Sequence, residues 1–191
     1  MTDTNERMPA IPRDHMDDAQ RAAADELIAG PRKGVKGPFI PLLRSPQLMA
    51  RLQKVGEYLR FESALSRRVN EFVTLVVSRA WTQQFEWATH VQLAIGAGTA
   101  AQTIDALREG RRPTGMSPEE ELAYDFTTEL QRNRGVSDTT YRTCVETFGE
   151  RGVIDLVGLI GYFMTASMVL NVAHTPPEPA AGVDPLPFLP R

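Results

Sequence analysis

Cysteine is almost absent from this chain, because Cys144 is the only one among 191 residues. A single cysteine excludes an internal disulfide framework and a metal cluster built on cysteine thiolates. A lone cysteine with no activating neighbours is usually inert, so a redox protein that works through Cys144 is the least favoured hypothesis.

The chain also lacks an excess of charge of either sign. Its 21 basic and 24 acidic residues give a net charge of -3. The basic pairs are short and scattered, and acidic residues lie near them: Arg32–Lys33, Arg67–Arg68 and Arg111–Arg112. This distribution is not the basic footprint of a nucleic-acid-binding protein, so we expect no nucleic-acid partner.

An apolar leader is missing as well, since residues 1–15 are polar and partly acidic. This composition predicts a cytoplasmic protein. The one long run without charge is Leu156–Ala173, close to the roughly 20 residues of a membrane span. Because Gly158, Gly161 and Asn171 interrupt it, we favour a buried core helix or a subunit-interface helix, and we expect no membrane partner.

No segment alternates between apolar and polar residues for long enough to require a β-strand. The sequence therefore predicts an all-α fold of about eight helices. We expect a flexible N-terminal arm over residues 1–16, one helical domain over 17–173 and a proline-rich C-terminal arm over 174–191.

Capping residues and helical periodicity place the helices. Ser66 is the expected N-cap of the 67–80 helix, and Ser117 with Glu120 forms a capping box. Thr99 is the expected cap of the 99–109 helix, and Leu48 and Val55 belong to the apolar spacing of the 46–60 helix. The expected helices are 17–29, 46–60, 67–80, 83–96, 99–109, 118–133, 138–148 and 149–171.

The loop over residues 30–45 is rich in glycine and proline and has no expected regular structure. A loop of this length is often an active-site lid or a pocket wall. It could equally be a surface connector whose Phe39 fills a gap in the core.

The 68–97 stretch carries the side chains that are best suited to catalysis. Glu86 and His90 are four residues apart, and Gln83 lies one turn earlier on the same helix. Glu71 lies on the preceding helix, and antiparallel pairing would bring it to the same place. Buried acid and imidazole groups are costly in an apolar helix pair unless they are paired or used.

A carboxylate bonded to one imidazole nitrogen fixes the tautomer and raises the basicity of the other nitrogen. Two carboxyl groups in one site push their pKa values apart, which leaves one of them protonated near neutral pH. The bland alternative is a Glu–His pair on a solvated helix face. Two carboxylates and one histidine are weak evidence for a metal, so we predict no metal site.

The spacing of Glu71, Gln83, Glu86 and His90 resembles the carboxymuconolactone decarboxylase family, which includes the AhpD-type alkylhydroperoxidases. The AhpD motif is a glutamate, then Cys-x-x-Cys, then a histidine four residues after the second cysteine. Aligning the glutamate on Glu71 puts the cysteine positions at Gln83 and Glu86 and the histidine at His90. One branch of the family lacks the cysteine pair, and this sequence resembles that branch. The likeness extends over three further segments: Gly30–Leu48, Arg60–Ser63 and Phe148–Phe163.

The departure from the AhpD motif matters as much as the match. AhpD-type peroxide reduction uses the thiolate and the resolving thiol of the cysteine pair. Gln83 and Glu86 occupy those positions, and Cys144 lies far along the chain. We therefore expect no thiol peroxidase activity of that type, even if the fold is grouped with peroxidases.

The resemblance implies a decarboxylase that acts on a lactone or a related small carboxylic acid without a cofactor. Such a reaction needs stabilisation of an oxyanion and protonation of a carbon. His90 is the expected proton donor, or the hydrogen-bond donor to the lactone oxygen, with Glu86 as its partner acid. Glu71 is expected to orient the imidazole.

A dianionic substrate also needs cations, for which Arg60 and Arg44 are candidates, although both could be solvated helix ends. Trp87 and Phe39 could wall an apolar pocket, and Trp87 could equally belong to the core. Gln83 is either a substrate-binding residue or a filler of the lost cysteine position.

Other functions stay open at this point. The same Glu/His pair could serve hydration or isomerisation, and the protein could be a non-catalytic oligomer that binds a small acidic metabolite. The resemblance further implies a homo-oligomer, a trimer or a hexamer. We expect the last helix and the C-terminal tail at its interface, because an exposed apolar helix would favour aggregation.

Overall fold

The computed structural model describes residues 5–177 and 180–188 of the chain, and in that part it contains eight α-helices, one short 3₁₀ helix and no strand. The predicted all-α fold is confirmed. The α-helices are α1 Asp18–Ala29, α2 Phe39–Leu42, α3 Pro46–Phe61, α4 Arg67–Ala80, α5 Gln84–Gly96, α6 Ala101–Arg108, α7 Pro118–Asn133 and α8 Asp138–Ala173.

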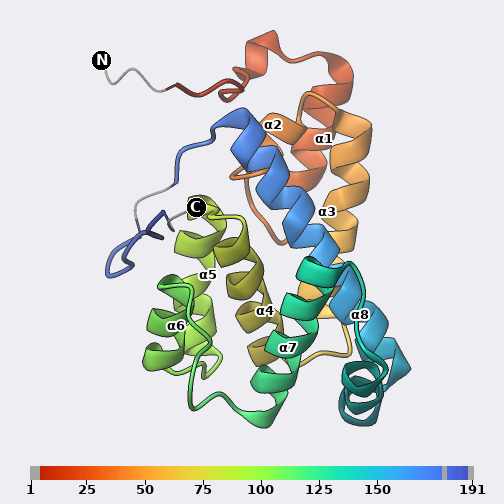
Figure 1. Ribbon diagram of the computed structural model, residues 1–191. Helices are drawn as coiled ribbons and strands as arrows, with labels where there is room; N and C mark the ends of the chain where they lie inside the picture. Colours follow the sequence, from red (N-terminus) through yellow and green to blue (C-terminus); the bar gives the residue numbers. More distant parts are fainter. Residues whose placement is uncertain (1–4, 178–179, 189–191) are drawn as a thin grey trace.

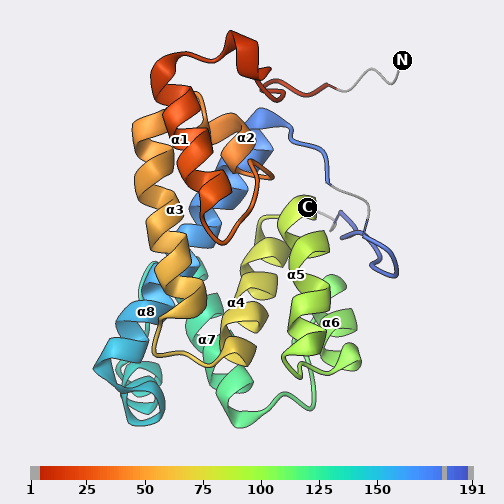
Figure 2. The same cartoon turned by 180° about the vertical axis from the view of Figure 1, so that it is seen from behind.

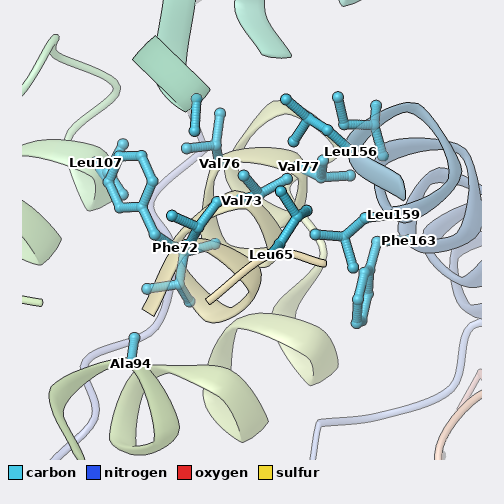
Figure 3. Close-up of a cluster of buried hydrophobic side chains, with 14 of the residues drawn as sticks. Leu65, Phe72, Val73, Val76, Val77, Ala94, Leu107, Leu156, Leu159 and Phe163 are labelled. Carbon is cyan, nitrogen blue, oxygen red and sulfur yellow. The ribbon is translucent and has the colours of Figure 1, made fainter. Parts of the chain in front are cut away.

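Helix α4 lies at the centre of the bundle, with α5, α7 and α8 around it (Figures 1 and 2). Every residue from Val69 to Arg79 is buried, as expected for a helix that is apolar on most of its surface. Figure 3 shows Val77 near Leu156 of α8, and Phe72 on the opposite side of α4 near Leu107. Each such side chain contributes roughly 1.5–3 kcal/mol by leaving water.

A second apolar cluster joins α1, α2 and α3 and includes Leu27, Leu43 and Met49. The apolar spacing expected on α3 is wrong in part, because Leu48 and Val55 are 49% and 47% exposed. The helix turns a different face inward, which carries Met49 together with the polar Gln53 and the side-chain-free Gly56.

Two local predictions need correction. The 30–45 loop is interrupted by the short helix α2, in which Phe39 is buried. Thr99 does not cap α6, because Ala100 is the N-cap residue and no side chain serves as a cap there. The Thr99 hydroxyl instead donates a hydrogen bond of 2.8 Å to Glu120 on α7.

Helix α8 contains both of the last two expected helices, joined at Gly149 with φ 70° and ψ 168°. By length and composition alone α8 could cross a membrane, but half of its most apolar 18-residue window is buried. Leu156 and Leu159 lie in the core, so α8 is a core helix of the bundle. Ile154 and Val157 on its outer face are exposed, and a subunit interface there stays a prediction.

The described part of the N-terminal arm lies along the C-terminal end of α8. The Arg7 N–H donates a 2.8 Å hydrogen bond to the Ala173 carbonyl. The Arg44 guanidinium donates to the carbonyl of Pro9 at 2.8 Å, which ties the arm to the segment after α2.

The described part of the C-terminal tail packs back onto α5. The Gln84 side chain donates to the Leu186 carbonyl at 2.7 Å and accepts from the Leu186 N–H at 2.9 Å. The Trp87 indole N–H donates to the Asp184 carbonyl at 3.1 Å. These contacts fix the path of the tail over α5.

A buried carboxylate holds α7 against α4. Glu120 completes the predicted capping box with Ser117 and is fully buried. It accepts two hydrogen bonds from the Arg68 guanidinium, at 2.9 and 2.8 Å, and one from Thr99. Burial raises the pKa of this carboxyl, but the bonds from Arg68, Ser117 and Thr99 outweigh burial, so the pKa lies below its ordinary value.

We expect Glu120→Ala to lower the free energy of unfolding by about 2–3 kcal/mol, because Arg68 loses its buried partner. Since the folded pKa of Glu120 is lowered, its contribution is fully present above the ordinary glutamate pKa of about 4.3 and is lost as the pH falls through the folded value. Urea denaturation between pH 7 and pH 3 measures both effects. The matched control is Glu119→Ala on the exposed side of the same turn, with an expected change within about 0.5 kcal/mol. Equal losses in the two variants would contradict the assignment.

Candidate functional site

Helices α4 and α5 form a tight hairpin. Thr82 turns the chain between them with φ 47°, and Gln83 caps α5 through hydrogen bonds that its side-chain oxygen accepts from the N–H groups of Phe85 and Glu86. The Gln83 amide also donates to Asn171 on α8 at 2.9 Å. The hairpin brings Glu71 of α4 next to His90 of α5.

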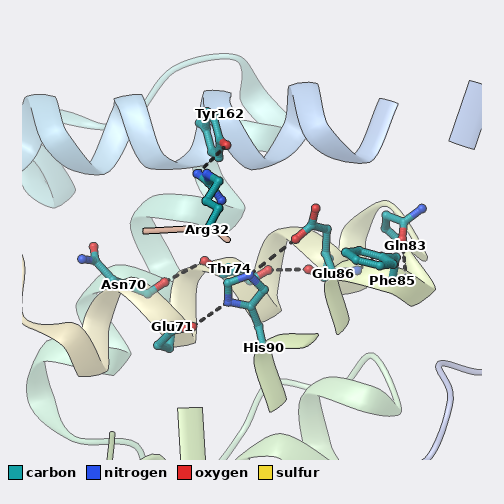
Figure 4. Close-up of polar contacts among 10 residues, drawn as sticks. Arg32, Asn70, Glu71, Thr74, Gln83, Phe85, Glu86, His90 and Tyr162 are labelled. Atoms are coloured by element: carbon teal, nitrogen blue, oxygen red, sulfur yellow. Dashed lines mark hydrogen bonds and ion pairs between the residues drawn. The ribbon is translucent and has the colours of Figure 1, made fainter. Parts of the chain in front are cut away.

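His90 lies between two carboxylates (Figure 4). Its Nδ1 is 2.6 Å from Glu71 Oε2, and its Nε2 is 3.5 Å from Glu86 Oε2. The side chains of His90, Glu71 and Glu86 are only 5%, 8% and 5% exposed. The imidazole is therefore oriented by Glu71 and presents Nε2 to Glu86.

The two carboxylates decide the charge of this imidazole. Burial lowers the pKa of His90, but the hydrogen bonds to Glu71 and Glu86 and their negative charges raise it by more, so the pKa lies above its ordinary value. The imidazolium form is thus favoured to a higher pH than in a free histidine.

A cavity of about 390 Å³ opens on one side of this histidine. His90 and Glu86 line it, together with three cationic side chains: Arg32, Lys36 and Arg60. The volume lies in the range of small-molecule sites. The cavity thus combines a proton-carrying imidazole with an excess of positive charge.

Aromatic side chains shape the cavity opposite the helix hairpin. Arg32 donates a 3.3 Å hydrogen bond to the Tyr162 hydroxyl, and its guanidinium carbon lies 4.5 Å from the centre of the Phe39 ring. The Phe163 ring meets His90 edge-on, with centroids 5.1 Å apart. Gly56 is needed here, because a Cβ at that position would lie 2.3 Å from the Tyr162 oxygen.

The structure brings five of the sequence-predicted residues to this place. Glu71 lies behind the imidazole, and Glu86, His90, Phe39 and Arg60 line the cavity. The loop before α2 forms part of the cavity wall through residues 31–38.

Three candidates lie elsewhere. The Gln83 side chain is used in capping α5 and is not part of the cavity lining. Trp87 is a fully buried core residue that contacts the tail. Arg44 holds the N-terminal arm and does not line the cavity. Local structure explains all three positions.

Sequence reasoning missed Arg32, Lys36, Tyr162 and Phe163. The basic residues of the 30–45 loop were a usable signal once the loop was considered a pocket wall. No sequence signal distinguished Tyr162 from the other residues of the apolar last helix, because its role depends on how α8 packs against α3.

The described residues contain neither a group of side chains placed to bind a metal ion nor a reactive thiol. Within residues 5–177 and 180–188, no group of three or more His, Cys, Asp and Glu side chains is placed to hold a metal ion. Cys144 is fully buried in the core, and burial, followed by the charge of Glu129, raises the pKa of its thiol to about 11.

Comparison with known proteins finds a matching family profile and solved structures with a similar fold. The sequence profile of the carboxymuconolactone decarboxylase family matches residues 46–129. A solved AhpD-core, peroxidase-related protein from Ralstonia eutropha JMP134 has a TM-score of 0.74 at 15% identity, over 91% of this chain and 92% of that one. A peroxidase-related protein from Silicibacter sp. TM1040 has a TM-score of 0.71 at 14% identity, over 93% and 95% of the two chains. No curated protein matches the sequence significantly.

We expect the His90 imidazole to titrate above its ordinary pKa of 6.5, because two carboxylates face it. Nitrogen-15 NMR of the side chain measures this, with the other two histidines assigned through His15→Asn and His174→Asn. Glu71→Gln should lower the His90 pKa, since it removes the carboxylate at 2.6 Å. A His90 signal that titrates below 6.5 in the wild type would contradict the geometry.

Proposed function

We propose that this protein is a cofactor-independent decarboxylase of a small lactone or related carboxylic acid. The premise is that residues 46–129 match the profile of the carboxymuconolactone decarboxylase family and that the fold is AhpD-like. The observation that supports this proposal is His90, held between Glu71 and Glu86 at the edge of a cavity with three cations.

The reaction needs an acceptor for an electron pair and a donor for a proton. When an unsaturated lactone loses CO2 from its γ-carbon, the bond to the carboxylate breaks and its electron pair enters the ring as a dienolate. A proton then adds at the α-carbon. An imidazolium can meet either need, because its N–H can transfer the proton or donate a hydrogen bond to the oxyanion.

The two carboxylates have different roles in this proposal. Glu71 holds Nδ1 at 2.6 Å, which fixes the ring and leaves Nε2 as the proton-carrying atom. Glu86, at 3.5 Å from Nε2 and in the cavity lining, is the partner acid: it takes up a proton from solvent and passes it to Nε2 after turnover.

The cations select the substrate class. A substrate with two carboxylates carries two negative charges, and Arg32, Lys36 and Arg60 surround the space that it would occupy. Arg32 and Arg60 are better anchors than Lys36, because a guanidinium can bind a carboxylate through two parallel hydrogen bonds. In the structure the Arg32 guanidinium is held by Tyr162 and Phe39 at the cavity wall.

We expect the purified protein to release CO2 from γ-carboxymuconolactone, and His90→Gln to lower kcat by about 10²- to 10⁴-fold, the usual contribution of a general acid. Arg32→Gln should mainly raise KM, because it removes a carboxylate anchor. Arg44→Gln, a cation outside the cavity, is the matched control with unchanged kinetics. Circular dichroism checks that each variant is folded.

The outcomes separate the proposal from its alternatives. Turnover that survives in His90→Gln would overturn the assigned proton donor. An inactive wild type that binds the lactone, with binding weakened by Arg32→Gln, would favour a non-catalytic metabolite-binding protein. Neither turnover nor binding would remove this substrate, and other lactones and keto acids would be tested next.

Thiol-dependent peroxide reduction is expected to be absent although the structural neighbours are described as peroxidase-related. The AhpD cysteine positions hold Gln83 and Glu86, and Cys144 is buried with a raised thiol pKa. The measurement is peroxide consumption in the presence of a dithiol, for the wild type beside Cys144→Ser. Consumption that Cys144→Ser abolishes would show that this thiol is reactive.

A further inference from the structure

A second cavity of about 560 Å³ lies between the C-terminal end of α4, the segment after α6, and α7. It shares no lining residue with the cavity at His90. Val76 and Leu107 line it together with the aromatic side chains of Trp81 and Tyr124. These walls suit a flat apolar group.

The charged side chains in the lining are all cationic. They are Arg79, Arg111 and Arg132, and no Asp or Glu is among the residues that line the cavity. Arg111 is paired with Glu109, which lies outside the lining. Three guanidinium groups and no lining carboxylate favour an anionic ligand.

Arg79 is the strongest indication. Its residue is 6% exposed, yet among the described residues no carboxylate lies within 4 Å of its guanidinium. The partners of its Nη atoms are neutral: the carbonyls of Pro187 at 2.8 Å and Arg108 at 3.4 Å, and the Thr82 hydroxyl at 3.3 Å. Its Nε has no partner in the described part of the chain.

A buried guanidinium without a counterion is costly, and burial lowers the pKa of Arg79. An anion in this cavity would supply the countercharge. The adjacent Thr82 has φ 47°, an unfavourable conformation for a β-branched residue. Such backbone strain is concentrated at functional sites in proteins.

We propose that this second cavity binds a small aromatic carboxylate, with the carboxylate at Arg79 and Arg132 and the ring against the wall that includes Trp81 and Tyr124. This site is separate from the proposed decarboxylase site and does not depend on that activity.

The test uses benzoate as the probe and the intrinsic fluorescence of the full chain. The protein has two tryptophans, of which Trp81 lines this cavity and Trp87 is buried in the core. We expect a saturable change in tryptophan fluorescence on addition of benzoate, and we expect Trp81→Phe to lose this change. Calorimetry should give the same benzoate affinity for the wild type and for Trp81→Phe. The neutral isostere benzamide should bind at least about tenfold more weakly, since it makes no charge-assisted hydrogen bond.

Matched variants locate the bound probe. Arg79→Met and Arg132→Gln should each lower the affinity for benzoate by about tenfold. Arg132 is exposed at the cavity mouth, so its variant is informative even if Arg79→Met fails to fold. Arg51→Gln, at an exposed arginine of α3 outside both cavity linings, should leave binding unchanged.

Four results would overturn the proposal. They are no saturable binding of benzoate, equal affinity for benzamide, affinity unchanged in Arg132→Gln, and binding lost in Arg32→Gln instead. The last result would place the carboxylate in the cavity at His90.

Discussion

The hydrogen bond between Glu71 and His90 depends on the most buried helix of the molecule. Glu71 lies in the run of α4 that is buried throughout, and an ionised carboxylate there needs a partner. The imidazole of α5 provides it at 2.6 Å. The pair therefore connects the packing of the central hairpin to the protonation state of the histidine, and any shift of α5 along α4 would change both.

The cavity is assembled around this hairpin from segments that are distant in the sequence. The loop before α2 supplies Arg32, α3 supplies Arg60, and α8 supplies Tyr162. Gly56 shows how closely these elements approach, since any side chain at that position would displace Tyr162 or Arg32. The positive charge of the site is thus a product of tertiary packing.

Each of the two positions that hold cysteines in the AhpD motif has a structural role in this protein. Gln83 caps α5 and joins it to α8, so the first position is used for stability. Glu86 faces the histidine nitrogen that points to the cavity. A carboxylate at that place favours an imidazolium, whereas the cysteine of the AhpD motif serves thiol chemistry. The same fold can therefore support a proton-transfer site.

The sequence by itself determined the helices and the polar group at their centre. Capping residues such as Ser66 and Ser117 act locally, so the starts of α4 and α7 followed from sequence, and four-residue spacing placed Glu86 beside His90. Only the tertiary structure decided which side chains share the cavity. An apolar or basic residue carries no local signal of the element that it will face. For that reason Val55 proved half exposed and Trp87 lies in the core, while Arg32 and Tyr162 became visible only once the loop, α3 and α8 were packed together.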